Sequence, residues 1–271
     1  MPRKLHQATI LSHKTAGRGY FRLVLKAPDI AAAALPGQFV MLRVTDTLDP
    51  LLARPFGISA VIAKSAIEIL YRIAGRGTTL LTKAKTGQHL QLLGPLGKGF
   101  PLPEKGALPV LVAGGSGFPP LQFLSQRVGS HAHFFVGSRY KDCLPPSGVL
   151  KRIRENTATV HVATDDGSMG VQGTTIDILN AFLTKMEKKT HLVLYACGPH
   201  AMLAAVSKLA AEHSITCYVS MEERMACGLG VCMGCSVPMK AGGYKRACKE
   251  GPVFDSRDVE WAEQIPVKIR R

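Results

Sequence analysis

Four cysteines near the carboxyl end constrain this chain more than any other feature. They are Cys227, Cys232, Cys235 and Cys248, spaced C-x4-C-x2-C-x12-C. This spacing is the ligand arrangement of a plant-type [2Fe-2S] cluster. The stretch between the first three cysteines also contains Gly228, Gly230 and Gly234. These glycines let the backbone fold around a small inorganic core and direct N–H groups at its sulfurs. The sequence therefore predicts a [2Fe-2S] site.

A structural zinc site and ordinary buried cysteines are the alternatives. Zinc more often has two short C-x2-C motifs or histidine ligands, whereas only Cys232 and Cys235 form such a motif here.

The odd total of seven cysteines does not form a secreted disulfide pattern, and the first residues lack the apolar region of a signal peptide. No apolar run approaches the length of about 18 residues that a membrane helix needs. We therefore expect a cytoplasmic protein without membrane insertion.

An excess of positive charge raises nucleic acid as a possible partner. The chain has 34 Lys and Arg against 19 Asp and Glu, for a formal net charge of +15. The basic residues are scattered, however, and aromatic residues make up only 6% of the chain, so a platform for stacking bases is missing. Nucleotide cofactors or an acidic protein partner explain the charge as well. We therefore expect no nucleic-acid partner.

The apolar pattern divides the chain into two regions of different fold. Up to about residue 100, short apolar runs separated by turn residues predict six strands, which indicate a β-barrel. These runs are 8–11, 20–25, 39–44, 56–62, 67–73 and 89–93. Beyond residue 103, strands at 110–113, 133–136, 159–163 and 192–196 alternate with helices at 121–128, 176–182 and 201–211. That alternation is typical of an α/β domain with a parallel sheet, and a strand at 216–220 then leads into the cysteine loop.

Three strand ends in the α/β region carry residues suited to a nucleotide. Gly114, Gly115 and Gly117 form a glycine-rich turn that opens a helix and suggests a nicotinamide dinucleotide. Pro120 stands where the G-x-G-x-x-G fingerprint would have its last glycine, so a purely structural turn is the alternative.

The other two strand ends carry carboxylates and a Cys-Gly pair. Asp165 and Asp166 could accept from ribose hydroxyls, with a plain turn as the alternative, and they favour NAD over NADP. Cys197 is as consistent with a small buried residue as with a catalytic one, and Gly198 would let a nicotinamide or flavin ring approach the backbone.

The barrel offers two candidate phosphate contacts. Arg54 begins the strand that contains Phe56 and suits a diphosphate, although a surface arginine and a core phenylalanine are the ordinary reading of this pair. A second cradle would contain Gly75, Gly77, Thr78 and Thr79, if a helix begins at Thr78.

Taken in order, these motifs resemble the ferredoxin–NAD(P) reductase superfamily. Within it, the segments 220–235 and 244–254 are most similar to the iron–sulfur flavoprotein family of electron-transfer subunits of class 1B dihydroorotate dehydrogenase. The resemblance covers essentially the whole chain. It implies an FAD-binding barrel (1–103), an NAD-binding α/β domain (104–215) and a [2Fe-2S] module (216–271).

The resemblance also implies cofactor-binding roles for individual residues. The flavin motif matches Arg54, Pro55 and Phe56, the FAD phosphate loop matches Gly75, Gly77 and Thr78, and the nicotinamide-side loop matches Gly114, Gly115, Gly117 and Pro120. The expected cofactor-binding set is completed by Gly57, Tyr71, Thr79, Asp165, Cys197 and Gly198. Gly57 departs from the family, which usually has Ser or Thr there, with its hydroxyl near the reactive flavin nitrogen. Ser59 lies too far along the same strand face to replace that hydroxyl.

By this resemblance the chain is an oxidoreductase subunit of pyrimidine biosynthesis. Dihydroorotate is oxidised on a separate FMN-containing catalytic subunit, in a heterotetramer, and electrons pass through [2Fe-2S] and FAD to NAD⁺. The rim of the cysteine loop, 225–234, is the expected partner surface. One alternative is a subunit of an NAD(P)H-dependent ferredoxin oxidoreductase or sulfide dehydrogenase, where the first ligand is often Asp and not Cys. Another is a non-catalytic redox-sensing or zinc-stabilised binding protein.

Overall fold

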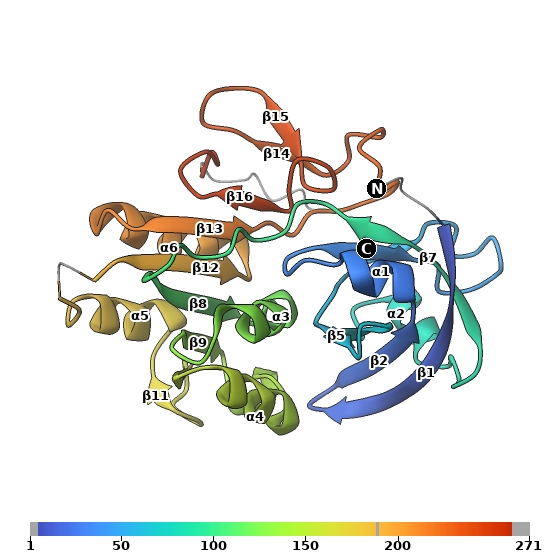
Figure 1. The fold of residues 1–271 in the computed structure, drawn as a ribbon, viewed down its shortest axis with the longest axis horizontal. Coiled ribbons are helices and arrows are strands. Elements are labelled where there is room, and N and C mark those ends of the chain that lie inside the picture. The colour runs from blue at the N-terminus through green and yellow to red at the C-terminus, as the bar shows by residue number, and fades with distance from the viewer. Residues whose placement is uncertain (1–4, 188–189, 262–271) are drawn as a thin grey trace.

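The computed structural model describes residues 5–187 and 190–261, which form two large units and a smaller one that lies across both (Figure 1). The first unit is an antiparallel sheet with the strand order β4-β3-β7-β1-β2-β6-β5. Its strands are β1 (Leu5–Gly17), β2 (Tyr20–Lys26), β3 (Phe39–Leu42), β4 (Arg54–Gly57), β5 (Ala60–Ile62), β6 (Ala66–Arg72) and β7 (His89–Leu96).

The first sheet closes into a barrel because its two end strands are neighbours in the chain. Only Ile58 and Ser59 separate β4 from β5, and Ile58 N–H donates to Gln38 O while Ser59 N–H donates to Glu68 O. The predicted single strand 56–62 is therefore two strands with a bend between them. Two short helices, α1 (Pro28–Ala33) and α2 (Arg76–Leu81), lie outside the sheet, and α2 begins two residues before the predicted Thr78.

The second unit is the predicted α/β domain, with the strand order β11-β10-β9-β8-β12-β13-β16. Its strands are β8 (Leu108–Gly114), β9 (His133–Ser138), β10 (Thr159–Thr164), β11 (Val171–Gln172), β12 (Leu192–Cys197), β13 (Thr216–Ser220) and β16 (Val253–Asp255). All of the pairings are parallel except that of β13 with β16. The chain leaves β8 toward β9 and later returns to β12 on the other side, so the topological switch point lies between β8 and β12.

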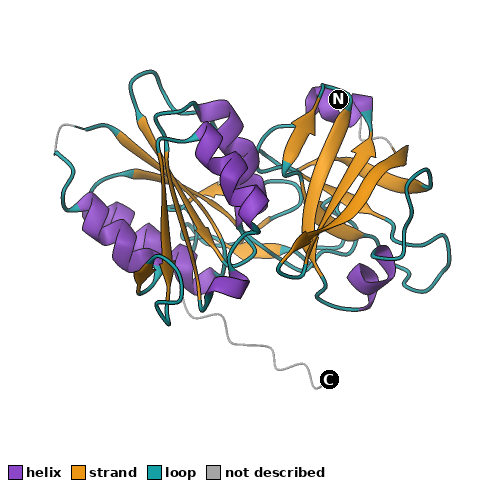
Figure 2. Ribbon diagram, turned by 90° about the horizontal axis from the view of Figure 1, so that it is seen from below, coloured by secondary structure: helices purple, strands orange, loops and turns teal. Residues whose placement is uncertain are grey.

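Helices cover both faces of this second sheet (Figure 2). They are α3 (Phe118–Val128), α4 (Ser147–Asn156), α5 (Thr175–Leu183) and α6 (His200–Glu212), with a short 3₁₀ turn, η1 (Lys141–Cys143). Val110 and Val112 pack against α5 and α6, whereas Leu111 and Ala113 pack against α3 and α4, as a strand buried on both faces requires. The sequence reasoning missed α4, whose apolar face is small: Val149, Leu150 and Ile153 among charged residues.

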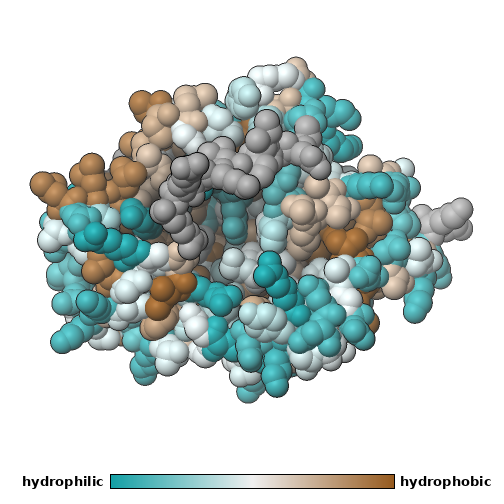
Figure 3. Space-filling view, turned by 180° about the vertical axis from the view of Figure 1, so that it is seen from behind, coloured by the Kyte–Doolittle hydropathy of each residue, from teal (hydrophilic) through white to brown (hydrophobic). Residues whose placement is uncertain are grey.

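The third unit contains the hairpin of β14 (Ser236–Pro238) and β15 (Tyr244–Arg246). It shares one hydrophobic core with the other two units, because Cys235 and Cys248 cluster with Met41 of the barrel and Val219 of β13. On the face opposite to that of Figure 1, hydrophobic residues gather in separate patches among hydrophilic ones (Figure 3). Within the described residues, none of the helices combines the length and apolar character needed to cross a membrane.

Candidate functional site

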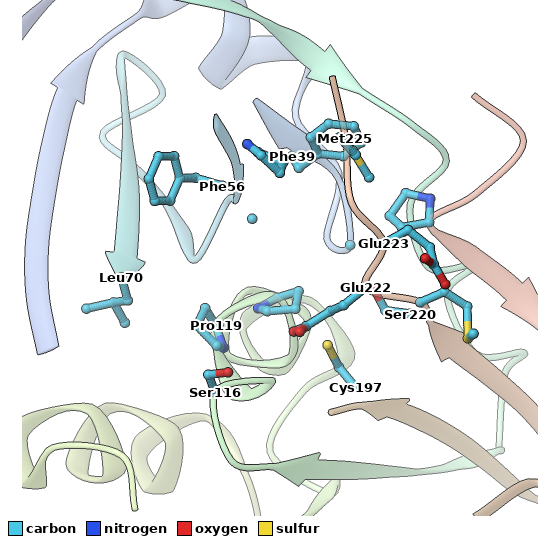
Figure 4. A pocket seen from close by; sticks show the side chains of 16 residues that line it. Phe39, Phe56, Leu70, Ser116, Pro119, Cys197, Ser220, Glu222, Glu223 and Met225 are labelled. Atoms are coloured by element: carbon cyan, nitrogen blue, oxygen red, sulfur yellow. The ribbon is translucent and has the colours of Figure 1, made fainter. Parts of the chain in front are cut away.

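All three units contribute walls to one pocket of about 310 Å³ (Figure 4). Phe56, Gly57 and Leu70 come from the barrel, and Ser116, Pro120 and Cys197 from the carboxyl ends of β8 and β12 and the start of α3. Glu222, Glu223 and Met225 come from the segment that leads to the cysteines. The pocket therefore lies at the switch point of the α/β sheet, where this class of fold binds ligands.

Gly57 leaves the barrel wall open toward the α/β domain. A Cβ atom at Gly57 would contact only Pro120, at 3.8 Å from Cδ. Phe56, which also lines the pocket, packs into the barrel core and is 8% exposed. Because Gly57 has no side chain, its backbone faces the pocket directly.

The turn between β8 and α3 packs closely on the end of β12. A Cβ at Gly117 would lie 2.2 Å from the carbonyl oxygen of Cys197, so only glycine fits there. Gly198 is confined less severely, because its Cβ would lie 3.0 Å from Gly114 N. Burial, reinforced by the negative charge of Glu222, raises the pKa of the Cys197 thiol well above its usual value. Cys197 thus lines the pocket as a neutral thiol, not as a thiolate nucleophile.

Glu222 is one of two acidic residues that line this pocket, and its carboxylate points inward (Figure 4). The Glu222 side chain is accessible to solvent through the pocket, but protein atoms surround its carboxyl group. This burial raises the pKa of Glu222. Sequence reasoning did not select Glu222 as a site residue. Its position just beyond β13, at the same sheet edge as Cys197, is the signal that could have found it.

A second pocket of about 740 Å³ adjoins the first along the β8 turn. Gly114, Gly115 and Asp165 line it, together with Arg139 and Tyr140, which follow β9 and were not predicted. Asp166 instead closes a turn, since its carboxylate accepts from the backbone N–H of Ser168 at 3.0 Å. The structure therefore separates the two adjacent aspartates, and only Asp165 lines the pocket.

Arg54 and the loop before α2 form a separate cluster at the barrel edge. Gly77 leaves room for the guanidinium, because a Cβ there would lie 2.8 Å from Arg54 Nε. The Thr78 hydroxyl accepts from Ala74 N–H at 2.8 Å, and the Thr79 hydroxyl donates to Gly75 O at 3.0 Å. These residues lie together, as the phosphate-cradle prediction requires, but they line neither pocket.

Tyr71 lies inside the barrel and lines neither pocket. Its ring stacks on Phe21 at 5.5 Å between centroids, and its hydroxyl pairs with His13 Nε2 at 2.9 Å. Its neighbour Leu70, on the opposite face of β6, lines the first pocket.

The four cysteines are arranged as two pairs. Cys227 has Cys232 as a hydrogen-bonding neighbour, and Cys248 has Cys235. The N–H groups of Cys232 and Leu229 point at Cys227 Sγ, the latter at 3.3 Å, and lower the pKa of Cys227 to about 6. Burial raises the pKa of Cys248 to about 12. The predicted direction of backbone N–H groups toward sulfur is thus found at Cys227.

Arg246 ties the two cysteine segments together. Its guanidinium donates to Gly230 O at 2.6 Å and to Glu250 Oε2 at 2.9 Å, so the turn that carries Cys248 is attached to the loop of the other three cysteines. Gly228 lets this loop approach the barrel, because a Cβ there would lie 2.5 Å from Met41 Cγ.

The pairing of the thiols suits a [2Fe-2S] cluster. Among the described residues, no three His, Cys, Asp or Glu side chains converge tightly enough for a single metal ion. Two thiol pairs with directed N–H groups provide the two ligands that each iron of a [2Fe-2S] cluster takes.

A barrel and a nucleotide-type α/β domain that share a pocket beside such a module define a flavin- and nicotinamide-dependent iron–sulfur reductase. Family models match in the same order: an oxidoreductase FAD-binding domain over 2–100, an oxidoreductase NAD-binding domain over 111–208, and the iron–sulfur cluster binding domain of dihydroorotate dehydrogenase B over 222–260.

Two curated relatives carry the name dihydroorotate dehydrogenase B (NAD(+)), electron transfer subunit. The protein of Desulforamulus reducens is 38% identical, over 95% of this chain and 99% of its own length. That of Geobacillus sp. (strain WCH70) is 36% identical, over 94% and 98%. This chain belongs to the family of dihydroorotate dehydrogenase B electron transfer subunits, with FAD-binding, NAD-binding and iron–sulfur domains.

Solved structures confirm the fold. A chain of an NADH-dependent reduced ferredoxin-NADP oxidoreductase superposes with a TM-score of 0.80 at 24% identity, covering 94% of this chain and 90% of that chain. The ferredoxin reductase of carbazole 1,9a-dioxygenase gives a TM-score of 0.66 at 20% identity, covering 79% and 67%.

Proposed function

We propose that this chain carries electrons from dihydroorotate oxidation, performed on an FMN-containing partner subunit, through a [2Fe-2S] cluster and FAD to NAD⁺. Bound FAD would supply the conversion between single electrons and hydride, because a cluster carries one electron at a time and NAD exchanges two. The family relationship supports the partner, and a heterotetramer in the cytoplasm is part of the proposal.

The observation that carries this proposal is the shared pocket. Met225 lines it and lies two residues before the ligand Cys227, while Gly57 and Cys197 face it from the barrel and the α/β domain. A flavin ring in this pocket would lie beside both the nicotinamide side and the cluster side. One-electron transfer and hydride transfer both require such proximity.

The geometry supports individual roles. Arg54, with the backbone of Gly75 and Gly77 and the hydroxyls of Thr78 and Thr79, would hold the FAD diphosphate. Pro55, Phe56 and Gly57 would shape the flavin side. Gly114, Gly115, Gly117, Pro120, Asp165 and Gly198 would shape the nicotinamide side, and Asp165 would favour NAD by repelling a 2′-phosphate. Cys227, Cys232, Cys235 and Cys248 would ligate iron.

We further propose that the functional units are 1–103, 104–215 and 216–271. The strands β13 and β16 of the last unit extend the α/β sheet. This continuity supports a rigid attachment of the cluster module to the nicotinamide side.

The test is a visible absorption spectrum of the anaerobically purified protein, titrated with NADH. Bleaching of flavin absorbance together with loss of cluster absorbance is expected. A colourless protein, or zinc in place of iron in elemental analysis, contradicts the proposal. Flavin bleaching without cluster reduction contradicts electron transfer between FAD and the cluster but is consistent with the proposed flavin site.

A further inference from the structure

A buried ionic cluster joins the barrel to the α/β domain, outside both pockets. Its centre is the carboxylate of Glu68 on β6, which is fully buried. Glu68 Oε2 accepts from Arg22 Nε at 2.5 Å and from Arg152 Nη1 at 2.9 Å. Glu68 Oε1 accepts from Ser59 Oγ at 3.0 Å and from Gln122 Nε2 at 3.3 Å. Two of these donors belong to the barrel and two to the α/β domain.

Glu68 is ionised in this environment. Burial alone would raise its pKa, but the hydrogen bonds and charges of Arg152 and Arg22 lower the pKa below its usual value. A buried carboxylate that loses a partner is left with uncompensated charge, which is strongly unfavourable. The arrangement with all four donors in place is therefore favoured over one in which the α/β domain has moved away.

The ionic cluster around Glu68 lies close to the edge where the two domains meet in the first pocket. Ser59 follows the pocket residue Gly57 by two positions, and Gln122 follows Pro120 by two positions. Gln122 Nε2 also donates to Ser59 O at 3.2 Å. Whatever fixes Ser59 against Gln122 therefore fixes Gly57 against Pro120.

We propose that Glu68 is a positioning residue that sets the separation of flavin and nicotinamide by clamping Ser59 of the barrel to Gln122 and Arg152 of the α/β domain. This inference rests on the proposed function. In the reverse direction used for the assay, with both cofactors bound, hydride would pass from NADH to the flavin to give NAD⁺ and reduced flavin, which requires the reacting atoms at roughly 3–3.5 Å. A misplacement of about 1 Å can slow such a step about 100-fold.

Arg152→Met and Arg22→Met form a matched pair. Each removes one donor from the same oxygen of Glu68, and the two arginine side chains are 31% and 37% exposed, so neither variant opens a deep cavity. Of the two arginines, only Arg152 connects Glu68 to the other domain. Three quantities are measured on the FAD-loaded full chain: flavin reduction at saturating NADH by stopped flow, the long-wavelength charge-transfer absorbance of the stacked nicotinamide–flavin pair, and Tm.

The clamp predicts that Arg152→Met slows flavin reduction at least ~10-fold and weakens the charge-transfer band, while Arg22→Met stays within about 2-fold of the wild type. Both variants have a lower Tm. Equal effects of the two variants on the NADH step, whether both are slow or both unchanged, overturn the inference, because the role of Glu68 is then confined to stability.

A separate readout distinguishes failure of the clamp from failure of the proposed function. If NADH does not reduce the flavin of the wild-type protein, the proposed function is contradicted, but the clamp is not. Amide hydrogen exchange without nucleotide still tests the clamp: exchange at Ser59 and along the first turns of α3 should be faster in Arg152→Met than in Arg22→Met. Identical exchange in the two variants overturns the inference.

Discussion

Gly117 offers a steric test of the site. A Cβ at this position would lie 2.2 Å from Cys197 O and 2.7 Å from Gly198 N. Both are backbone atoms at the end of β12, so they cannot rotate away as the tip of a flexible side chain could. Gly117→Ala must therefore push the turn before α3 away from β12, across the switch point that forms the pocket.

The cost of Gly117→Ala follows from the size of this displacement. Ordinary van der Waals contact begins at 3.4 Å, so the backbone separation must grow by more than an ångström. Overpacking that forces backbone shifts costs about 1–3 kcal/mol, and a backbone neighbour places Gly117→Ala near ~3 kcal/mol. In a domain of this size 1 kcal/mol lowers Tm by roughly 2–4 °C, so a decrease of roughly 6–12 °C is expected.

Gly148→Ala is the matched control for Gly117→Ala. Gly148 lies in α4, and a Cβ there meets no heavy atom within 4 Å. Alanine is a better helix former than glycine by ~0.8–1 kcal/mol, so Tm should rise slightly. Calorimetry gives both Tm values, and stopped flow gives flavin reduction by NADH, which should be slowed only in Gly117→Ala. A Gly117→Ala protein with wild-type Tm and wild-type reduction refutes the steric reasoning.

Three further predictions address the cluster, the rim and the pocket carboxylate. Cys248→Ser should lose iron and cluster absorbance while keeping FAD; full iron content would argue against Cys248 as a ligand. Met233 lies on the rim of the cysteine loop and is 49% exposed, so Met233→Glu should weaken binding of the catalytic subunit by ~10-fold or more in calorimetry. Val171→Glu, on the distant strand β11, should leave binding unchanged. Equal affinities of the two variants would refute the placement of the partner surface on this rim. Because burial raises the pKa of Glu222, its contribution to stability is full below the unfolded pKa and is lost as pH rises through the folded pKa. In flavin-free protein, Glu222→Gln should therefore have a higher Tm than the wild type at pH 8 but not at pH 4, and parallel Tm curves would contradict this.

The sequence predicted the features that depend on local spacing. The cysteine loop, the glycine turn before α3 and the alternation of strands and helices each occupy a short stretch whose residue types have one dominant structural use. The strand 216–220 has the predicted bounds, Thr216–Ser220. Where local patterns are ambiguous, prediction was poorer. The run 56–62 was predicted as one strand, yet the chain bends at Ile58 and Ser59 to close the barrel.

Contacts between units could not be predicted because their chemistry is divided over distant segments. Glu68 sits in an apolar run, and the sequence does not indicate that Arg152, 84 positions away, lies 2.9 Å from it. Tyr71 illustrates the same limit: sequence places it next to Leu70, but the alternation of β6 sends Leu70 to the pocket and Tyr71 into the barrel.

The placement of Glu68 bears on how one pocket can serve three units. The cluster module is joined to the α/β sheet through β13 and β16, and to the barrel through the Lys98 N–H bond to Gly251 O and the shared core around Met41. Glu68 lies at a different contact, where the barrel meets Gln122 of α3 and Arg152 of α4. Loss of the clamp should therefore change the separation of flavin and nicotinamide, while the contacts between the barrel and the cluster module remain. Because electrons from NADH would reach the cluster through the flavin, Arg152→Met should slow cluster reduction no more than it slows flavin reduction.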